Sequence, residues 1–211
     1  MTKILPKDFP GIEDRIYVGF WLRFGAFWLD IIIMLPWIFL VNYINNLGRL
    51  YILYTLIPSY AFSLFYGIYT VKKWGGTPGK LIVNVKIVRK DGAKANWKEA
   101  ILRYAVQFLI GIPMTVASII VIFSMTDAQY ESMSFFARSA FIGANMPIWN
   151  KPVIWANQIW IWSEFVVLLF NKRKRALHDF IAGTVVIKKK YEQVAEQFAD
   201  DSGGQYVPPL P

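Results

Sequence analysis

The chain has 211 residues, of which 55% are hydrophobic and 17% aromatic, and its formal net charge at pH 7 is +9. This content is too apolar for an ordinary soluble domain of that length. Cysteine is absent, which excludes a disulfide framework, a thiolate metal site and a cysteine nucleophile.

Residues 1–19 precede the first apolar stretch and carry both acidic and basic side chains. They contain no short apolar region of the kind that a cleaved signal peptide requires. We therefore expect a cytoplasmic N-terminal segment followed by an uncleaved first membrane anchor.

Four apolar stretches follow, and each is long enough to cross a bilayer as a helix. About 20 residues at a rise of ~1.5 Å per residue match a hydrocarbon layer of ~30 Å. The expected fold class is an all-α integral membrane protein with four transmembrane helices, at about residues 20–41, 50–71, 100–124 and 153–170.

Two short strands are predicted outside these helices. Residues 81–88 are rich in β-branched side chains and lead into Asp91-Gly92, a strong hairpin turn signal. Residues 184–187, after the fourth span, have the same character. We expect a small cytoplasmic β element, which unites the two segments.

The chain is divided into the N-terminal segment 1–19, a transmembrane domain over 20–190 and a polar C-terminal tail over 191–211. The tail begins helix-like, from Tyr191 to Phe198, and disorder is the default expectation for its end. The outer segment 125–152 is too polar for a fifth span, and its aromatic residues favour an amphipathic piece at the membrane interface.

The positive charge is distributed unevenly among the loops. Segments 72–99 and 125–152 have equal length, yet the first carries eight Lys or Arg residues and the second carries two. Short loops rich in Lys and Arg stay on the cytoplasmic side. The charge therefore predicts cytoplasmic termini, with some attraction to anionic headgroups of the bilayer, and it argues against a nucleic-acid partner.

Asp30 is a carboxylate near the middle of the first span, whose other charged residue is Arg23. Such a residue costs at least ~2.5 kcal/mol in a membrane helix, so a partner or a water-filled cavity is expected. Both residues lie on one helix face, but ~10.5 Å apart along the axis, which is too far for direct contact. Each therefore needs another partner.

Glu164 in the fourth span lies at a depth similar to that of Asp30. Two carboxylates in a low-dielectric bundle favour at least one proton and attract a cation, so the pair is a hypothetical proton or cation site. The structural alternative is that each acid is hydrogen-bonded or ion-paired for assembly.

A charged network is expected near the inner interface, formed by Arg23, Arg103, His178 and Asp179. Asp179 is placed to neutralise one of the arginines, and His178 to titrate near neutral pH. The alternative is that His178-Asp179 is only a cap or salt-bridge partner. Since His178 is the chain's single histidine, a multi-histidine metal site is excluded, and neither a metal nor another cofactor is predicted.

The loop Gly75-Gly76-Thr77-Pro78-Gly79-Lys80 is similar to a phosphate-binding loop. However, Trp74 stands where that motif requires Gly, and Leu81 stands where it requires Ser or Thr. A turn leaving the second span, with its glycines supplying positive φ, accounts for it better.

These fragments occur together in one order. Arg23 to Asp30, Gly76 to Lys80 followed by a strand and Asp91-Gly92, then Arg103, then Arg175 to Thr184 resemble the RDD family over roughly residues 17–188. That family of prokaryotic membrane proteins is named for one arginine and two aspartates, which match Arg23, Asp30 and Asp179. The resemblance implies a multi-pass inner-membrane protein. Some members have been proposed as cation/proton antiporters, and others resemble accessory components.

Two functional hypotheses follow, neither of them enzymatic. In the first, the bundle transports monovalent cations or protons with Asp30 and Glu164 as binding carboxylates, which favours a homo-oligomer. In the second, the chain is a non-catalytic accessory or regulatory component that acts with a membrane partner protein. A membrane enzyme that acts on lipids ranks third, with His178 as its candidate residue, because no nucleophile–base pair is visible in the sequence.

Overall fold

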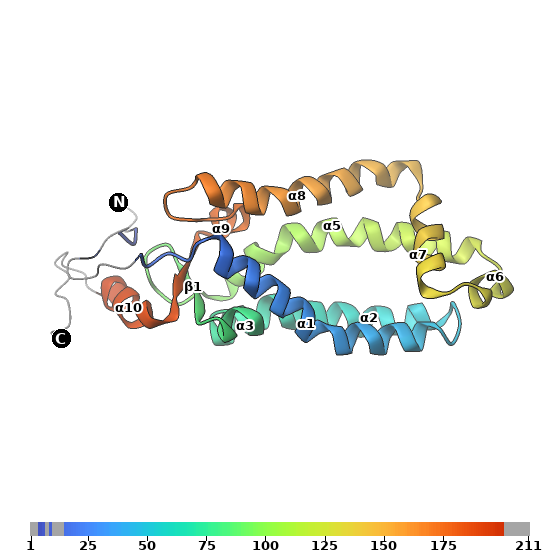
Figure 1. Ribbon diagram of the computed structural model, residues 1–211, viewed down its shortest axis with the longest axis horizontal. Helices are drawn as coiled ribbons and strands as arrows, with labels where there is room; N and C mark the ends of the chain where they lie inside the picture. The colour runs from blue at the N-terminus through green and yellow to red at the C-terminus, as the bar shows by residue number, and fades with distance from the viewer. Residues whose placement is uncertain (1–3, 7–8, 10–14, 201–211) are drawn as a thin grey trace. The chain divides into compact units, whose positions relative to one another are not determined.

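The structure is a computed structural model that describes residues 4–6, 9 and 15–200, without the side chains of Glu164 and Phe165. Figure 1 shows its helices and strands in chain order. Their bounds are α1 Phe20–Asn45, α2 Tyr51–Leu64, η1 Phe65–Tyr69, α3 Thr70–Trp74, α4 Pro78–Ile82, β1 Val85–Arg89, α5 Trp97–Ser124, α6 Asp127–Ser132, α7 Phe135–Ala144, η2 Ile148–Asn150, α8 Lys151–Phe170, α9 Leu177–Ala182, β2 Thr184–Lys188, η3 Lys189–Tyr191 and α10 Glu192–Asp200.

Within the described residues, four helical stretches are long and apolar enough to cross a membrane. They are Phe20–Asn45, Tyr51–Ile82, Trp97–Ser124 and Ile148–Phe170, so each contains the core of a predicted span. Large apolar side chains on them are exposed, for example Phe39 at 67% and Ile57 at 76%. A helix that presents apolar residues outward is suited to a lipid environment.

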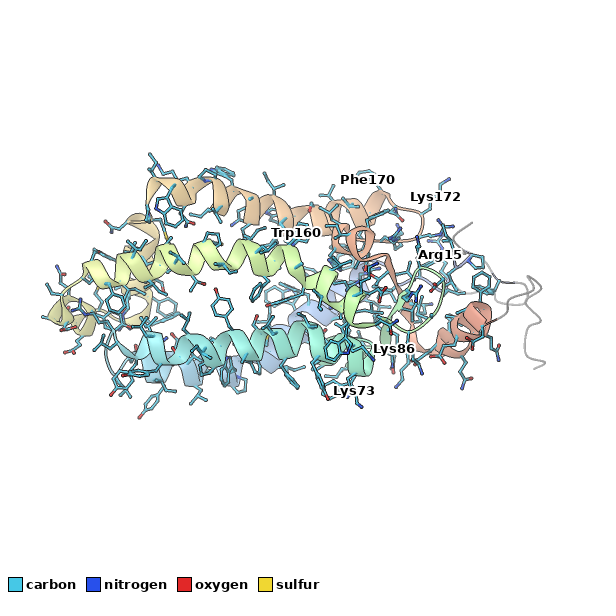
Figure 2. The ribbon with its side chains drawn as sticks, turned by 180° about the vertical axis from the view of Figure 1, so that it is seen from behind. Arg15, Lys73, Lys86, Trp160, Phe170 and Lys172 are labelled. Carbon is cyan, nitrogen blue, oxygen red and sulfur yellow. The ribbon has the colours of Figure 1, made fainter. Side chains whose placement is uncertain are left out.

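The chain forms two compact units. Unit 1 comprises residues 1–33, 66–104 and 163–211, and unit 2 comprises residues 34–65 and 105–162. Unit 1 carries 20 of the 23 Lys and Arg residues, among them those labelled in Figure 2, and unit 2 carries Arg49, Arg138 and Lys151.

Unit 1 contains a two-stranded antiparallel sheet. β1 pairs with β2 in a register that places Ile87 opposite Val186 and Val88 opposite Val185. On the other edge of β2, Val18 N donates to Val186 O at 3.0 Å and Lys188 N donates to Ile16 O at 3.0 Å. The predicted union of the two strand segments is confirmed, and the stretch before α1 joins them.

The sheet has two buried faces because both strands alternate between two apolar clusters. Val85, Ile87 and Val186 pack with Val71 of α3 and Ala100 of α5. The opposite face contributes to a cluster formed by Leu5, Phe9, Ile16, Tyr17, Val88, Val185, Ile187, Tyr191, Val194 and Ala195. Strands buried on both faces read as nearly continuous apolar runs, which agrees with the β-branched character of both segments.

The predicted helical start of the tail is present as α10. Its Val194 and Ala195 are buried in the second cluster, and Phe198 packs its ring edge-on against Phe9, with centroids 5.9 Å apart. The expectation of disorder concerns residues 201–211, which lie outside the described residues.

In unit 2, the predicted outer segment forms two short helices, α6 and α7. Thr126 caps α6 with a reciprocal capping box to Gln129, and Tyr130 is buried with Ile122 and Met125. Arg138 of α7 stacks on the Tyr130 ring, 3.8 Å from the ring centroid, and donates to Asn46 Oδ1 at 3.2 Å. The segment is therefore anchored by specific polar contacts to the turn after α1.

Candidate functional site

Asp179 is completely buried at the third position of α9. Its Oδ2 accepts a hydrogen bond from Ala176 N at 3.0 Å, which satisfies one of the free N–H groups at the helix start. α9 ends at Gly183, whose φ of 67° lies in the left-handed region that glycine adopts without strain. A short capped helix thus places the carboxylate directly before β2.

Two arginines from different membrane helices meet this carboxylate. Arg23 Nη1 of α1 lies 2.7 Å from Asp179 Oδ2, and Arg103 Nη1 of α5 contacts Oδ1. Thr184 Oγ1 donates to Oδ1 at 3.1 Å and accepts from Arg103 Nη1 at 2.6 Å. Sequence analysis predicted that Asp179 would neutralise one arginine, whereas the structure pairs Asp179 with two arginines.

These charges determine the protonation of Asp179. Burial acts to raise the pKa of its carboxyl, but the positive charges of Arg103 and Arg23 outweigh burial and hold the pKa well below the ordinary value. The carboxylate is therefore ionised throughout the physiological pH range and ties α1, α5 and α9 together electrostatically.

A pH dependence of stability follows. Because the folded pKa of Asp179 is depressed, its ionisation stabilises the fold fully above the unfolded pKa of ~3.9, and this contribution is lost as pH falls through the folded pKa. We expect the difference in melting temperature between wild type and Asp179→Asn to be constant above about pH 5 and to shrink below about pH 4. Differential scanning fluorimetry in detergent measures it, and a difference that grows on acidification would contradict the assignment.

His178 lies beside the same arginine. Arg103 Nη2 is 2.6 Å from His178 Nε2, and His178 Nε2 is 3.6 Å from Asp179 Oδ1. A guanidinium has donors only, so a hydrogen bond between these two groups requires Nε2 to be the acceptor. The structure thus brings together Arg23, Arg103, His178 and Asp179; their function beyond this contact stays a prediction.

Asp30 belongs to a second cluster in unit 1, with 8% of its surface exposed. Tyr66, in the π-helical turn η1, donates its hydroxyl to Oδ1 at 2.6 Å. Gly79 N donates to Oδ1 at 2.7 Å, and Thr77 Oγ1 donates to Oδ2 at 2.6 Å. Lys80 Nζ lies 3.8 Å from Oδ2. As predicted, Asp30 and Arg23 find separate partners.

The residues before β1 are built to approach this carboxylate. Thr77 is extended, as expected before a proline, and Pro78 occupies the first position of α4 with a φ suited to a helix start. A Cβ on Gly79 would lie 2.5 Å from Ala26 O and 2.6 Å from Asp30 Oδ1, so only glycine fits. Gly75 has the predicted positive φ, 76°.

Sequence analysis missed Tyr66, Thr77, Gly79 and Lys80 as partners of Asp30. The signal was available in the loop that fails as a phosphate site, because its glycine permits close approach of an anion to a backbone N–H group. Here the anion is a carboxylate of the chain itself. The predicted Glu164 lies in α8, and its side chain is outside the described residues. Among the residues described, no group of three or more His, Asp and Glu side chains is placed to hold a metal ion.

A family model described as the RDD family matches residues 17–183, which include Arg23, Asp30 and Asp179. The chain is also 28% identical over 136 residues to Uncharacterized protein YxaI of Bacillus subtilis (strain 168), an alignment that covers 54% of this chain and 90% of that protein. No solved structure matches the chain.

Proposed function

The chain belongs to the RDD family, and from that premise we propose that it is a non-catalytic component of a prokaryotic cytoplasmic membrane that acts with a partner protein. In this proposal the two family aspartates are structural. They hold the membrane helices of unit 1 to the small sheet, so that the sheet is presented in fixed form.

The observation that carries the proposal is that side chains and backbone groups of the chain already occupy the hydrogen-bond acceptor positions of both carboxylates. Asp30 accepts three hydrogen bonds and has an ammonium group 3.8 Å from Oδ2. Asp179 accepts from two guanidinium groups, a hydroxyl and a backbone N–H group. A carboxylate offers about four lone-pair positions, and a transported cation would have to compete for them. Such saturation favours a structural role.

Cation or proton transport is the second candidate, and the Lys80–Asp30 ion pair favours it. Lys80 Nζ touches the carboxylate at 3.8 Å, longer than its hydrogen bonds. A transported cation would displace the Lys80 ammonium from Asp30 Oδ2, and the lysine would release a proton. Cation movement would then be coupled to proton movement. A buried lysine, unlike an arginine, gives up its proton readily.

One set of measurements separates the two candidates. We expect affinity purification of the full chain in mild detergent to yield a partner in stoichiometric amount. In proteoliposomes, we expect wild type, Asp30→Asn and Lys80→Gln to give the same cation-driven pH signal as empty vesicles. A wild-type flux that is lost in a folded Asp30→Asn variant would replace the accessory function by transport.

The proposed topology places both termini in the cytoplasm, because 20 of the 23 basic residues belong to unit 1. The absence of cysteine makes this directly testable. Lys73 and Phe136 are exposed, the first at the end of α3 and the second in α7. We expect an impermeant maleimide to label Phe136→Cys in intact cells and Lys73→Cys only after permeabilisation. The reverse pattern would invert the topology.

A further inference from the structure

Three aromatic side chains form a partly exposed cluster in unit 1. Tyr69 belongs to η1, Trp74 ends α3 and Trp97 begins α5. The Tyr69 ring meets the Trp74 ring edge-on, with centroids 6.3 Å apart, and is tilted against the Trp97 ring at 6.4 Å. The exposed fractions are 38%, 42% and 52%, so each side chain packs against the protein and still presents part of its surface to the surroundings.

The cluster lies at the ends of two apolar helical stretches. The helical run that begins at Tyr51 is interrupted after Trp74, where Gly75 has a φ of 76°. Trp97 is the first residue of the apolar stretch Trp97–Ser124. Tryptophan and tyrosine gather at the headgroup level of membranes because their rings are apolar and their N–H or O–H groups are polar. The cluster is therefore suited to the membrane–water boundary.

Two exposed lysines flank the cluster. Lys73 lies in the last turn of α3, four residues after Tyr69 and therefore on the same side of the helical run. Its side chain extends outward from the end of α3 in Figure 2. Lys98 directly follows Trp97 in the first turn of α5. Within the part of the chain that the structure describes, neither ammonium group forms an ion pair or a hydrogen bond.

The acids nearest to these lysines along the chain are already engaged. Glu99 accepts a hydrogen bond from Asn96 N at 2.9 Å at the start of α5, and Asp91 lies 2.7 Å from Arg89 Nη2. The two lysines thus carry positive charge without an internal counter-ion, beside rings that suit the headgroup level. This combination is complementary to an anionic headgroup, which attracts basic side chains next to a membrane helix.

We propose that this surface, formed by Tyr69, Trp74 and Trp97 with Lys73 and Lys98, binds headgroups of anionic phospholipids. The rings lie at the level of the headgroups, and each ammonium group meets a phosphate of the surrounding leaflet. Separate lipids serve the separate lysines, so the two side chains need not converge on one ligand. The exposed rings favour a lipid over a soluble anion, which would gain nothing from them. The inference goes beyond the accessory function and holds equally if the chain is a transporter.

Energy transfer from the tryptophans of the full chain to dansyl-labelled phosphatidylglycerol in phosphatidylcholine vesicles tests the proposal. Unlabelled phosphatidylglycerol and phosphatidylcholine compete with the probe, and their relative effectiveness gives the headgroup preference. We expect Lys73→Gln and Lys98→Gln each to lower this preference by about fivefold, because each variant removes one cation near the anionic surface. Lys73→Arg/Lys98→Arg keeps both charges and should keep the preference within about twofold of wild type.

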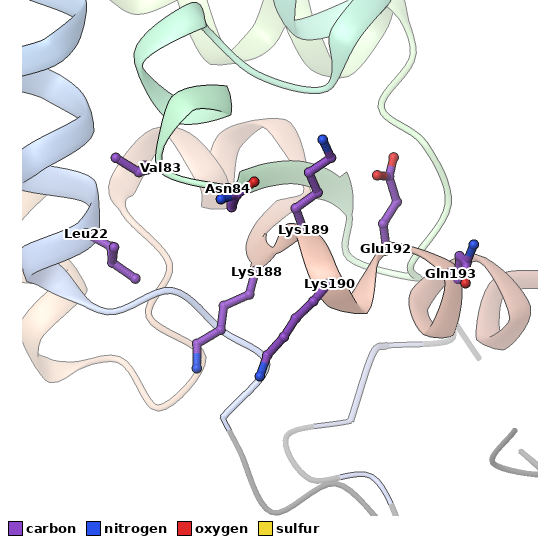
Figure 3. A pocket seen from close by; sticks show the side chains of 8 residues that line it. All are labelled: Leu22, Val83, Asn84, Lys188, Lys189, Lys190, Glu192 and Gln193. Atoms are coloured by element: carbon purple, nitrogen blue, oxygen red, sulfur yellow. The ribbon is translucent and has the colours of Figure 1, made fainter. Parts of the chain in front are cut away.

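The matched control removes the same charge elsewhere in unit 1. Lys189 and Lys190 are exposed and line a pocket of about 670 Å³, whose described lining includes no residue of the proposed surface (Figure 3). Lys189→Gln/Lys190→Gln should keep the preference within about twofold of wild type, whereas Lys73→Gln/Lys98→Gln should lose most of it.

Equal losses in the two glutamine double variants would reduce the effect to general basic charge and overturn the proposal. A wild-type preference in Lys73→Gln/Lys98→Gln would also overturn it and would leave the lysines to an acidic partner protein. Displacement of the probe by inorganic phosphate, beyond that by chloride at equal ionic strength, would assign the surface to a free anion instead. If the double variant does not elute as a folded species, the two single variants decide, since both side chains are exposed.

Discussion

Replacement of Asp179 by asparagine is expected to cost roughly 3–5 kcal/mol of stability, the largest effect of any single substitution proposed for this chain. The variant would leave the guanidinium groups of Arg23 and Arg103 buried without their shared anion, with side chains 10% and 7% exposed. Removing one partner of a buried ionic cluster is far more costly than removing the cluster as a whole, because the remaining charges stay desolvated. The thermal midpoint in detergent measures the loss.

Asp127→Asn provides the matched control. Asp127 pairs with Arg49 Nε at 2.6 Å, a distance similar to that in the Asp179 cluster, but its side chain is 68% exposed. An exposed ion pair contributes less than about 1 kcal/mol, so this variant should melt close to wild type. Equal shifts in the two variants would show that burial does not determine the strength of these pairs.

Gly79→Ala is expected to destabilise the protein by roughly 2–4 kcal/mol although it adds a single methyl group. The new Cβ would stand 2.5 Å from Ala26 O, a backbone atom that cannot rotate away. The loop would have to retreat from α1, which breaks the 2.7 Å hydrogen bond from Gly79 N to Asp30. The loss combines overpacking with the loss of one of the two hydrogen bonds to a buried carboxylate oxygen, since Tyr66 still donates to it.

Gly25→Ala in α1 is the control for this substitution, because a Cβ at Gly25 meets no atom within 4 Å. Glycine in a helix interior has excess freedom in the unfolded chain, so alanine there should be neutral or stabilise by up to about 1 kcal/mol. If Gly79→Ala melts like Gly25→Ala, then the close approach of the loop to Asp30 does not exist in solution.

The sequence was sufficient for the elements that depend on local pattern. The four apolar stretches, the strand at 184–187 and the helix after Tyr191 follow from hydrophobicity and β-branching within a few residues. The strand predicted over 81–88 is wrong in its first half, because residues 81–82 belong to α4 and the strand begins at Val85. The separation of Arg23 from Asp30 also followed, since helix rise alone sets it.

The partners of Asp30 did not follow, because they depend on tertiary approach. Tyr66 comes from 36 residues further along the chain and Gly79 from 49, and no local periodicity links them to the first span. The register of β2 between β1 and the stretch at Ile16 could not be predicted either, because both faces of this short strand are apolar and the pattern does not select one register. Whether Asp30 and Glu164 carry a cation remains a prediction.

The position of Asp179 near the end of the chain has a consequence for biogenesis. During synthesis, Arg23 and Arg103 leave the ribosome long before their common counter-ion Asp179, which follows all four apolar segments. Until residue 179 emerges, the first and third of these segments carry an uncompensated cation at their margins. Closure of the ion cluster and of the sheet is thus a late event, because Asp179 and β2 both follow the fourth apolar segment.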